Sequence, residues 1–274
     1  MSTFQPLRVA ILGSGRLPGL ETLLQDPNRG QLYELSCVLS SEPELVESGR
    51  LDAHRIPVLI HPIRHFHRER NLPLCNLNAR AEYDAELAGM LSPFEVDTVV
   101  LLGWNWILTA PMLSMFPERI LALHDADLTL KDGDGGRRFV GRRAVHDALF
   151  AGEPETRSSV YLATRDIGKG PVLLMTGPYP VAPLAKDAYA WGAADMLDTY
   201  ARAHRDWMIR DAWGRLAAKA IEHVAAGTIQ ILGDLAWIDG VPGPCRIGEA
   251  PAQCDAQKDQ IQRGIPASCP FIQT

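Results

Sequence analysis

The chain has 274 residues and a mass of 30.1 kDa, which suffices for one large domain or two small ones. Hydrophobic residues make up 46% of it, so it can bury a substantial core. The formal net charge of −6 and the lack of a Lys/Arg-rich block argue against a nucleic-acid surface. We therefore expect a globular protein whose partners are small molecules.

No apolar run approaches the roughly 18 to 20 residues that span a bilayer, and the N-terminus enters a strand-like segment without a charged leader. We therefore expect a cytoplasmic protein. The odd number of cysteines, with no CxxC pair, predicts reduced thiols rather than a disulfide framework or a zinc site. These cysteines are Cys37, Cys75, Cys245, Cys254 and Cys269.

The N-terminal half alternates short aliphatic and β-branched runs with helix-like patterns. Such continuous apolar runs are typical of parallel strands that are buried on both faces. They predict a doubly wound α/β fold with a mostly parallel sheet. The expected strands are 7–13, 33–39, 56–61, 97–103 and 119–124.

In the second half a short helix-like stretch ends at Gly152, and strand-like runs follow at 158–164 and 171–177. Their short connection predicts an antiparallel hairpin at the edge of the sheet. Apolar residues then recur every three or four positions from 196 to 224. This spacing predicts one long or two consecutive amphipathic helices, with Trp207 and Leu216 packed inward.

Residues 227–240 predict a small hairpin, and the tail that follows has little periodicity. We therefore expect one domain over residues 1–241 and an irregular C-terminal extension over 242–274. No internal repeat is visible.

The glycine-rich turn after the first strand, "GSGRLPGLETLL", opens a helix. Its residues Gly13, Ser14, Gly15 and Arg16 can hold an anion through backbone N–H groups and the Arg16 charge. The spacing differs from the dinucleotide-binding pattern. An anion site and a tight turn without a ligand are about equally supported by this stretch.

Two other polar stretches predict no metal site. His65 and His67 lie in "IRHFHRER" without a third ligand, so we expect an exposed loop or strand edge there. The segment "KDGDGG", residues 131–136, lacks the ligand spacing of a calcium loop, and we expect a flexible loop.

His124 ends the last strand of the first half, with Asp125 and Asp127 beside it. Open α/β sheets bind ligands outside the carboxyl ends of their strands. This position favours a functional histidine, although a histidine that only bonds to the backbone is the alternative.

From about Arg8 to Asp239 the chain resembles the glycinamide ribonucleotide formyltransferase family, which also includes formyltetrahydrofolate hydrolases. The resemblance implies a Rossmann-like formyltransferase fold and 10-formyltetrahydrofolate as the one-carbon donor. It is carried by segments in the family order, namely "VVLLGWNWIL", "RILALH", "GRRAVHDALFAGEPETRSSVYLATRDIGKGPVLL" and "AWIDG".

The resemblance assigns roles to individual residues. Gly13 and Gly15 match the family's phosphate-holding turn, and Arg80 matches an arginine that holds the acceptor. Ile107 and Leu108 match backbone positions that contact the folate. The implied folate-binding residues are Trp104, Asn105, Trp106, Ile107 and Leu108.

The catalytic set matches only in part. His124 matches the family histidine, but Ala122 stands at the asparagine position and Gly168 at the aspartate position. In the family, the asparagine and histidine donate hydrogen bonds to the oxyanion formed in formyl transfer, and the aspartate orients the imidazole. Loss of one oxyanion donor typically lowers the rate about 10²- to 10³-fold.

Candidates for replacement lie nearby in the sequence. Asp125, Asp127 or Asp166 can orient His124, and Asn105 carries an amide. The loop 124–141 is longer than the family's, so we expect a reshaped acceptor pocket.

The leading hypothesis is a formyl or related one-carbon transferase that acts on an amine-containing or phosphorylated small molecule other than glycinamide ribonucleotide. A non-catalytic protein that binds a folate or an anionic metabolite is the first alternative, and a formyltetrahydrofolate hydrolase is the second. If the chain self-associates, we expect a homodimer.

Overall fold

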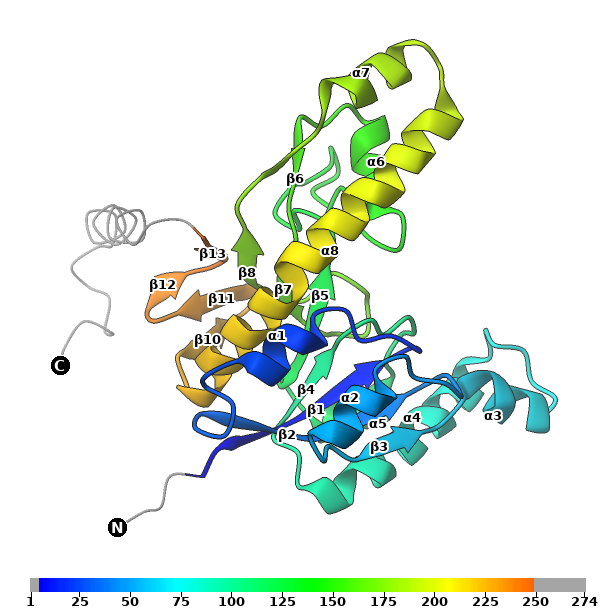
Figure 1. The fold of residues 1–274 in the computed structure, drawn as a ribbon, viewed down its shortest axis with the longest axis vertical. Helices are drawn as coiled ribbons and strands as arrows, with labels where there is room; N and C mark the ends of the chain where they lie inside the picture. The colour runs from blue at the N-terminus through cyan, green and yellow to red at the C-terminus, as the bar shows by residue number, and fades with distance from the viewer. Residues whose placement is uncertain (1–4, 249–274) are drawn as a thin grey trace.

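The computed structural model describes residues 5–248. An eight-stranded sheet forms the centre of the fold, and only the pairings of β5 with β7 and of β7 with β8 are antiparallel (Figure 1). All five predicted N-terminal strands are present, and the fifth ends at His124 as predicted. In spatial order the strands are β13 (Cys245–Ile247), β8 (Val172–Thr176), β7 (Ser159–Leu162), β5 (Ile120–His124), β4 (Thr98–Leu101), β1 (Leu7–Gly13), β2 (Tyr33–Ser40) and β3 (Val58–Ile60).

Helices cover both faces of this sheet, because the strands are apolar on both sides. One apolar cluster contains side chains of α1 (Leu20–Gln25), α2 (Ser48–Ala53), α6 (Ala144–Phe150) and α8 (Ala194–Ala225). The other contains side chains of α3 (Ile63–Glu69), α4 (Leu77–Leu91) and α5 (Ala110–Met115). The predicted doubly wound, Rossmann-like fold is thereby confirmed.

The predicted amphipathic region is a single helix, α8, of 32 residues. At 1.5 Å per residue it is about 48 Å long, so one part of it extends past the sheet with α7 (Pro183–Ala190) beside it (Figure 1). Leu216 is fully buried as expected. The inward position predicted for Trp207 is wrong: its side chain is 41% exposed and meets the ring of Tyr179 edge-on.

Residues 159–176 form the predicted antiparallel pair, but this pair does not end the sheet, because β13 adds to β8 in parallel. Residues 242–248 of the predicted extension thus belong to the folded body, and residues 249–274 lie outside the described part. The predicted hairpin, β10 (Ile229–Leu232) and β11 (Leu235–Ile238), gains a third strand, β12 (Val241–Pro242). Two short strands, β6 (Glu155–Thr156) and β9 (Tyr179–Pro180), pair separately.

The histidine-rich segment is a helix rather than the predicted loop or strand edge. Ile63, Phe66 and His67 are buried on one side of α3, and His67 Nδ1 lies 3.0 Å from the carbonyl oxygen of Pro73. Residues 131–137 form a tight turn in which Asp132 accepts hydrogen bonds from the backbone of Asp134 and Gly136.

Within residues 5–248, no group of three or more His, Cys, Asp or Glu side chains is placed to hold a metal ion. None of the helices described is long and apolar enough to cross a membrane. Cys37 and Cys75 are free thiols, and Cys254 and Cys269 lie outside the described residues.

Two glycines set the distance between α8 and the start of α1. A Cβ on Gly214 would lie 2.3 Å from the hydroxyl of Thr22, and one on Gly19 would lie 2.5 Å from the backbone nitrogen of Gly214. Gly19 also has a φ of +90°, which favours glycine.

We expect Gly214→Ala to lower the free energy of unfolding by about 1–3 kcal/mol, because a methyl group there overpacks the contact. Gly89 in α4 is the matched control, since a Cβ there would meet no atom within 4 Å. Gly89→Ala should raise the free energy of unfolding by up to about 1 kcal/mol. Urea denaturation of both variants measures the difference, and equal effects would contradict the assigned contact.

Candidate active site

A cleft of about 610 Å³ lies at the carboxyl ends of β1, β4 and β5, where the strand order of the sheet reverses. Such a switch point is the usual ligand site of open α/β sheets. Of the residues predicted for the site, the cleft lining contains Ser14, Arg16, Trp104, Asn105, Trp106, Ile107, Leu108, His124 and Asp125. Gly13, Gly15, Arg80, Asp127 and Asp166 do not belong to this lining.

His124 is half-buried at the end of β5, and its Nε2 atom has no hydrogen-bond partner among the described residues. A hydrogen bond with the backbone of Phe139 favours the charged form of the ring. Burial opposes that charge more strongly, and the nearby Arg205 and Arg137 add to the effect, so the pKa of His124 falls to about 4. At neutral pH the cleft therefore contains an uncharged imidazole with one free ring nitrogen.

Asp125 is buried beside His124 and is already engaged in other contacts. Its carboxylate accepts hydrogen bonds from Trp213 Nε1 at 2.6 Å and from Arg205 Nε at 2.8 Å. Burial raises the pKa of Asp125 to about 6, although Arg205 and Trp213 act in the opposite direction. These contacts join the end of β5 to α8 across the cleft.

The two other predicted aspartates point elsewhere. Asp127 accepts a hydrogen bond from the backbone of Thr129 at 2.9 Å and lies 3.4 Å from Arg157. Asp166 is exposed and pairs with Lys169 at 3.6 Å. Neither side chain has a recorded contact with His124, so the structure gives no support to their predicted role in orienting it.

Of the two positions without the expected polar side chain, Ala122 faces the cleft and Gly168 is closed to simple replacement. Ala122 is 3% exposed and lines the cleft. Gly168 has a φ of +70°, and a Cβ there would lie 2.8 Å from Val140 Cγ1, so an aspartate would strain this loop. The conformation of this loop therefore requires glycine at position 168.

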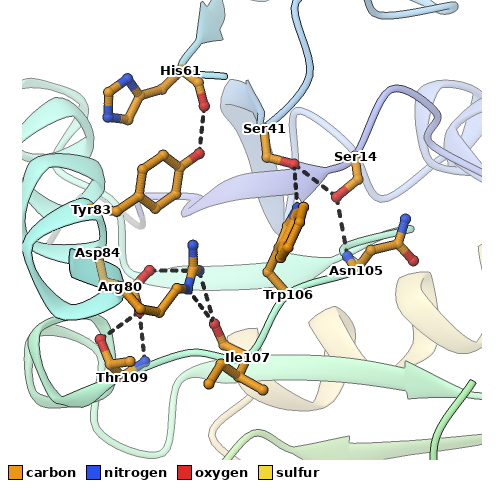
Figure 2. Close-up of polar contacts among 10 residues, drawn as sticks. All are labelled: Ser14, Ser41, His61, Arg80, Tyr83, Asp84, Asn105, Trp106, Ile107 and Thr109. Carbon is orange, nitrogen blue, oxygen red and sulfur yellow. Dashed lines mark hydrogen bonds and ion pairs between the residues drawn. The ribbon is translucent and has the colours of Figure 1, made fainter. Parts of the chain in front are cut away.

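Arg80 is buried and holds the segment 104–108 through hydrogen bonds to Ile107. It is 2% exposed and donates to the carbonyl oxygen of Ile107 from Nε at 3.0 Å and from Nη2 at 2.8 Å (Figure 2). Nη2 also lies 2.7 Å from Asp84, which in turn accepts hydrogen bonds from the backbone and hydroxyl of Thr109. The predicted contact of Arg80 with an acceptor stays untested, and the observed contacts give it an internal role.

Hydrogen bonds tie the glycine-rich turn to the same segment. The hydroxyls of Ser14 and Ser41 lie 2.9 Å apart, Asn105 N–H donates to Ser14, and Trp106 Nε1 donates to Ser41 (Figure 2). The Ser14 N–H donates to the carbonyl of Gly103. That amide is therefore not free for an anion, which limits the predicted anion site to the rest of the turn.

Three further residues line the cleft that the sequence did not predict: Tyr161, Arg205 and Trp213. Tyr161 lies opposite Ala122 in the antiparallel pair of β7 and β5. The predicted hairpin joined β7 to β8 and did not include the pairing of β7 with β5, and residues of α8 come more than 80 positions after His124. Period-2 alternation places Tyr161 on one face of its strand, but only the register identifies its neighbour.

An open, mostly parallel sheet with a polar cleft at its switch point defines a doubly wound α/β protein with a ligand site at the strand ends. Residues 7–188 match the formyl transferase family, and the chain belongs to this family.

Curated relatives include the phosphoribosylglycinamide formyltransferase of Haemophilus influenzae, 24% identical over 64% of this chain and 74% of its own length. The formyltetrahydrofolate deformylase of Bacillus subtilis is 26% identical over 61% of this chain and 48% of its own length. The trifunctional purine biosynthetic protein adenosine-3 of Drosophila melanogaster is 26% identical, over 64% of this chain, but the match spans only 12% of that longer protein.

Among solved structures, the glycinamide ribonucleotide transformylase 1 of Symbiobacterium toebii superimposes with a TM-score of 0.65 at 23% identity. The match covers 86% of this chain and 99% of that one. A formyltetrahydrofolate deformylase from Pseudomonas syringae gives 0.64 at 16% identity, over 85% of this chain and 66% of that one. At these identities the structures support the shared fold.

Proposed function

We propose that the protein transfers a formyl group from 10-formyltetrahydrofolate to the amine of a small molecule other than glycinamide ribonucleotide. The observation that carries the proposal is the free Nε2 of a neutral His124 in the cleft. A free imidazole nitrogen that opens into a ligand cleft is placed to accept a proton from an attacking amine.

The transfer requires few changes in bonding. A new C–N bond forms between the formyl carbon and the acceptor amine, and the C–N bond to the folate breaks. The amine loses one proton and the folate nitrogen gains one, so no oxidant or reductant is needed. His124 Nε2 takes the first proton, and Asp125 holds the end of β5 against α8 while the imidazole acts.

The lining of the cleft fits a folate on one side. Trp104 Nε1 is buried without a hydrogen-bond partner among the described residues, and Trp104, Trp106, Ile107 and Leu108 supply apolar surface. A folate presents a flat ring system with polar edges, which these apolar side chains and the free Trp104 Nε1 can accommodate. Arg80 and the serine pair keep this segment in place.

The remaining lining fits an acceptor that carries both an amine and an anionic group. Arg16, Arg142 and Arg210 are exposed at the cleft and have no ion-pair partner within residues 5–248. Glu47 also lines the cleft, and its Oε2 is buried without a hydrogen-bond partner in that part of the chain. Arginines bind carboxylate or phosphate, and a free carboxylate binds an ammonium group.

The experiment incubates the protein with 10-formyltetrahydrofolate and a panel of amino acids, amino sugars and their phosphates. Mass spectrometry should detect one acceptor whose mass increases by one formyl group. Glycinamide ribonucleotide should react at least about tenfold more slowly than that acceptor. The absence of both folate binding and formylated product across the panel would overturn the proposal.

The turnover should also have an unusual pH dependence. The pKa of His124 lies at about 4 in the folded protein, below the ordinary 6.5, so the neutral base persists as the pH falls. Because the pKa of Asp125 lies at about 6, the test uses Asp125→Asn, in which we expect kcat to stay level from pH 8 to about 5 and to fall only as the pH drops through 4. A decline centred near 6.5 in this variant, in the range where circular dichroism shows a folded protein, would contradict the buried environment of His124.

Two alternatives have their own supporting observations. Relatives named formyltetrahydrofolate deformylase support a hydrolase, in which water replaces the amine and formate appears without any acceptor. The absence of polar side chains at Ala122 and Gly168 supports a binding protein, for which calorimetry would detect folate binding without turnover. The cytoplasmic location remains a prediction.

A further inference from the structure

We propose that the Tyr161 hydroxyl donates the hydrogen bond that stabilises negative charge on the formyl oxygen, and that Arg137 is the residue that positions it. This inference rests on the proposed formyl transfer and identifies a further catalytic residue for it. In acyl transfer, charge develops on the carbonyl oxygen, and a fixed donor aimed at that oxygen contributes most of the stabilisation.

His124 does not supply this donor in its observed state. The backbone bond with Phe139 favours the protonated ring, so a ring N–H donates to the Phe139 carbonyl. Because Nε2 has no partner, this donor is Nδ1, and Nε2 of the neutral ring carries a lone pair. His124 is therefore arranged as a base, and the oxyanion donor has to come from another group.

Among the polar groups of the cleft, Tyr161 is the donor whose ring contacts His124, whereas the free Trp104 Nε1 belongs to the segment 104–108 assigned to the folate. Ala122 has no polar side chain, and the Asp125 carboxylate binds both Trp213 Nε1 and Arg205 Nε. Asn105 is exposed, and its backbone N–H is bound to Ser14. Tyr161 has none of these limits: it lines the cleft, and it is only 6% exposed.

The register of the sheet brings Tyr161 next to both Ala122 and His124. Tyr161 is the antiparallel partner of Ala122, and both side chains belong to the same apolar cluster. The Tyr161 ring meets the His124 ring edge-on, with 6.4 Å between their centroids. A carbonyl that reacts beside the His124 ring therefore lies close to the Tyr161 side chain.

The loop around Gly168 and the side chain of Arg137 fix the position of the Tyr161 hydroxyl. This hydroxyl accepts a hydrogen bond from the backbone of Gly168. Arg137 donates from Nη1 to the carbonyl of Gly168 and from Nη2 to that of Gly170 at 2.7 Å. Arg137 therefore fixes the loop that orients the phenol.

The phenol stays protonated under physiological conditions. Burial raises the pKa of Tyr161, and this effect outweighs the opposite effects of the Gly168 backbone and the Arg137 charge. The Tyr161 proton is thus available as a hydrogen-bond donor at neutral pH and does not need to be transferred. In this proposal His124 accepts the amine proton, and Tyr161 stabilises the negative charge on the formyl oxygen.

The test uses the full chain with 10-formyltetrahydrofolate and hydroxylamine, a small amine that needs no acceptor pocket. We expect Tyr161→Phe, which removes only the hydroxyl, to lower kcat about 10²-fold while KM for the folate changes less than about threefold. Tyr179→Phe is the matched control, because the Tyr179 hydroxyl is also bonded, to Asp211, but lies outside the cleft lining. It should leave kcat unchanged.

A second variant separates a catalytic effect from a structural one. Adding Ala122→Asn to Tyr161→Phe places an amide donor opposite the lost hydroxyl and should restore kcat at least about tenfold. Arg137→Met should lower kcat with unchanged folate KM, as expected for a positioning residue. Thermal unfolding of each variant shows that it is folded.

The outcomes separate this inference from the proposed function. If wild type formylates hydroxylamine and Tyr161→Phe does so at the wild-type rate, the role of Tyr161 is refuted and formyl transfer stands. If wild type neither binds the folate nor formylates hydroxylamine or any acceptor of the panel, the proposed function fails, and the inference fails with it.

Discussion

Replacing His124 with alanine is expected to lower the formyl-transfer rate at least about 10²-fold while the melting temperature stays within a few degrees of wild type. The imidazole supplies the base through its free Nε2, and loss of a general base costs about 10²- to 10⁴-fold. The side chain is half-buried at a strand end, so its removal is expected to cost little stability. Steady-state kinetics and thermal unfolding of the same preparation measure both effects.

His204 provides the matched control for this prediction. It is buried, with Nε2 2.7 Å from the hydroxyl of Thr156, and it does not line the cleft. His204→Ala should reduce stability by about 1–3 kcal/mol, because it leaves the buried Thr156 hydroxyl without this partner, and it should leave the rate near wild type. An unchanged rate in His124→Ala would refute the catalytic role of His124.

Replacing Arg80 with methionine is expected to cost about 3–5 kcal/mol of unfolding free energy. Methionine keeps most of the volume but leaves Asp84, which is 0% exposed, without its positive partner. Desolvation already raises the pKa of Asp84, and Arg80 counteracts it, so the variant should bind a proton there on folding and become relatively more stable at low pH. Urea denaturation at pH 5 and pH 8 measures both effects.

The exposed pair of Arg143 and Asp147 is the control for the buried one. These side chains are 69% and 51% exposed and lie 4.0 Å apart with the same i,i+4 spacing. Arg143→Met should change stability by no more than about 1 kcal/mol. If Arg80→Met is equally mild, the buried ion pair does not hold the segment 104–108 as proposed.

The strands of the parallel sheet could be predicted because their side chains are buried on both faces, which leaves continuous apolar runs in the sequence. The strand β13 has no such signal, since three residues form it only by pairing with β8. The helix α3 was mistaken for a loop because its alternating histidines resemble a period of two. Its buried residues Ile63, Phe66 and His67 follow the helical period instead.

The position of His124 at a strand end could be predicted, but its chemical state could not. Its low pKa arises from burial and from Arg205 and Arg137, which reach it from α8 and from the loop before α6. Asp125 was expected to assist His124 and instead joins Trp213 and Arg205. Such contacts between residues about 80 positions apart depend on packing, which no local pattern encodes.

The most direct test of the central claim follows a ¹³C-labelled formyl group from 10-formyltetrahydrofolate in a single turnover with the acceptor found in the panel. The account predicts that wild type moves the label into the new amide of that acceptor, and that His124→Ala binds the folate equally well but moves the label at least about 10²-fold more slowly. Label that appears only as free formate, or equal rates for the two proteins, would contradict formyl transfer by His124.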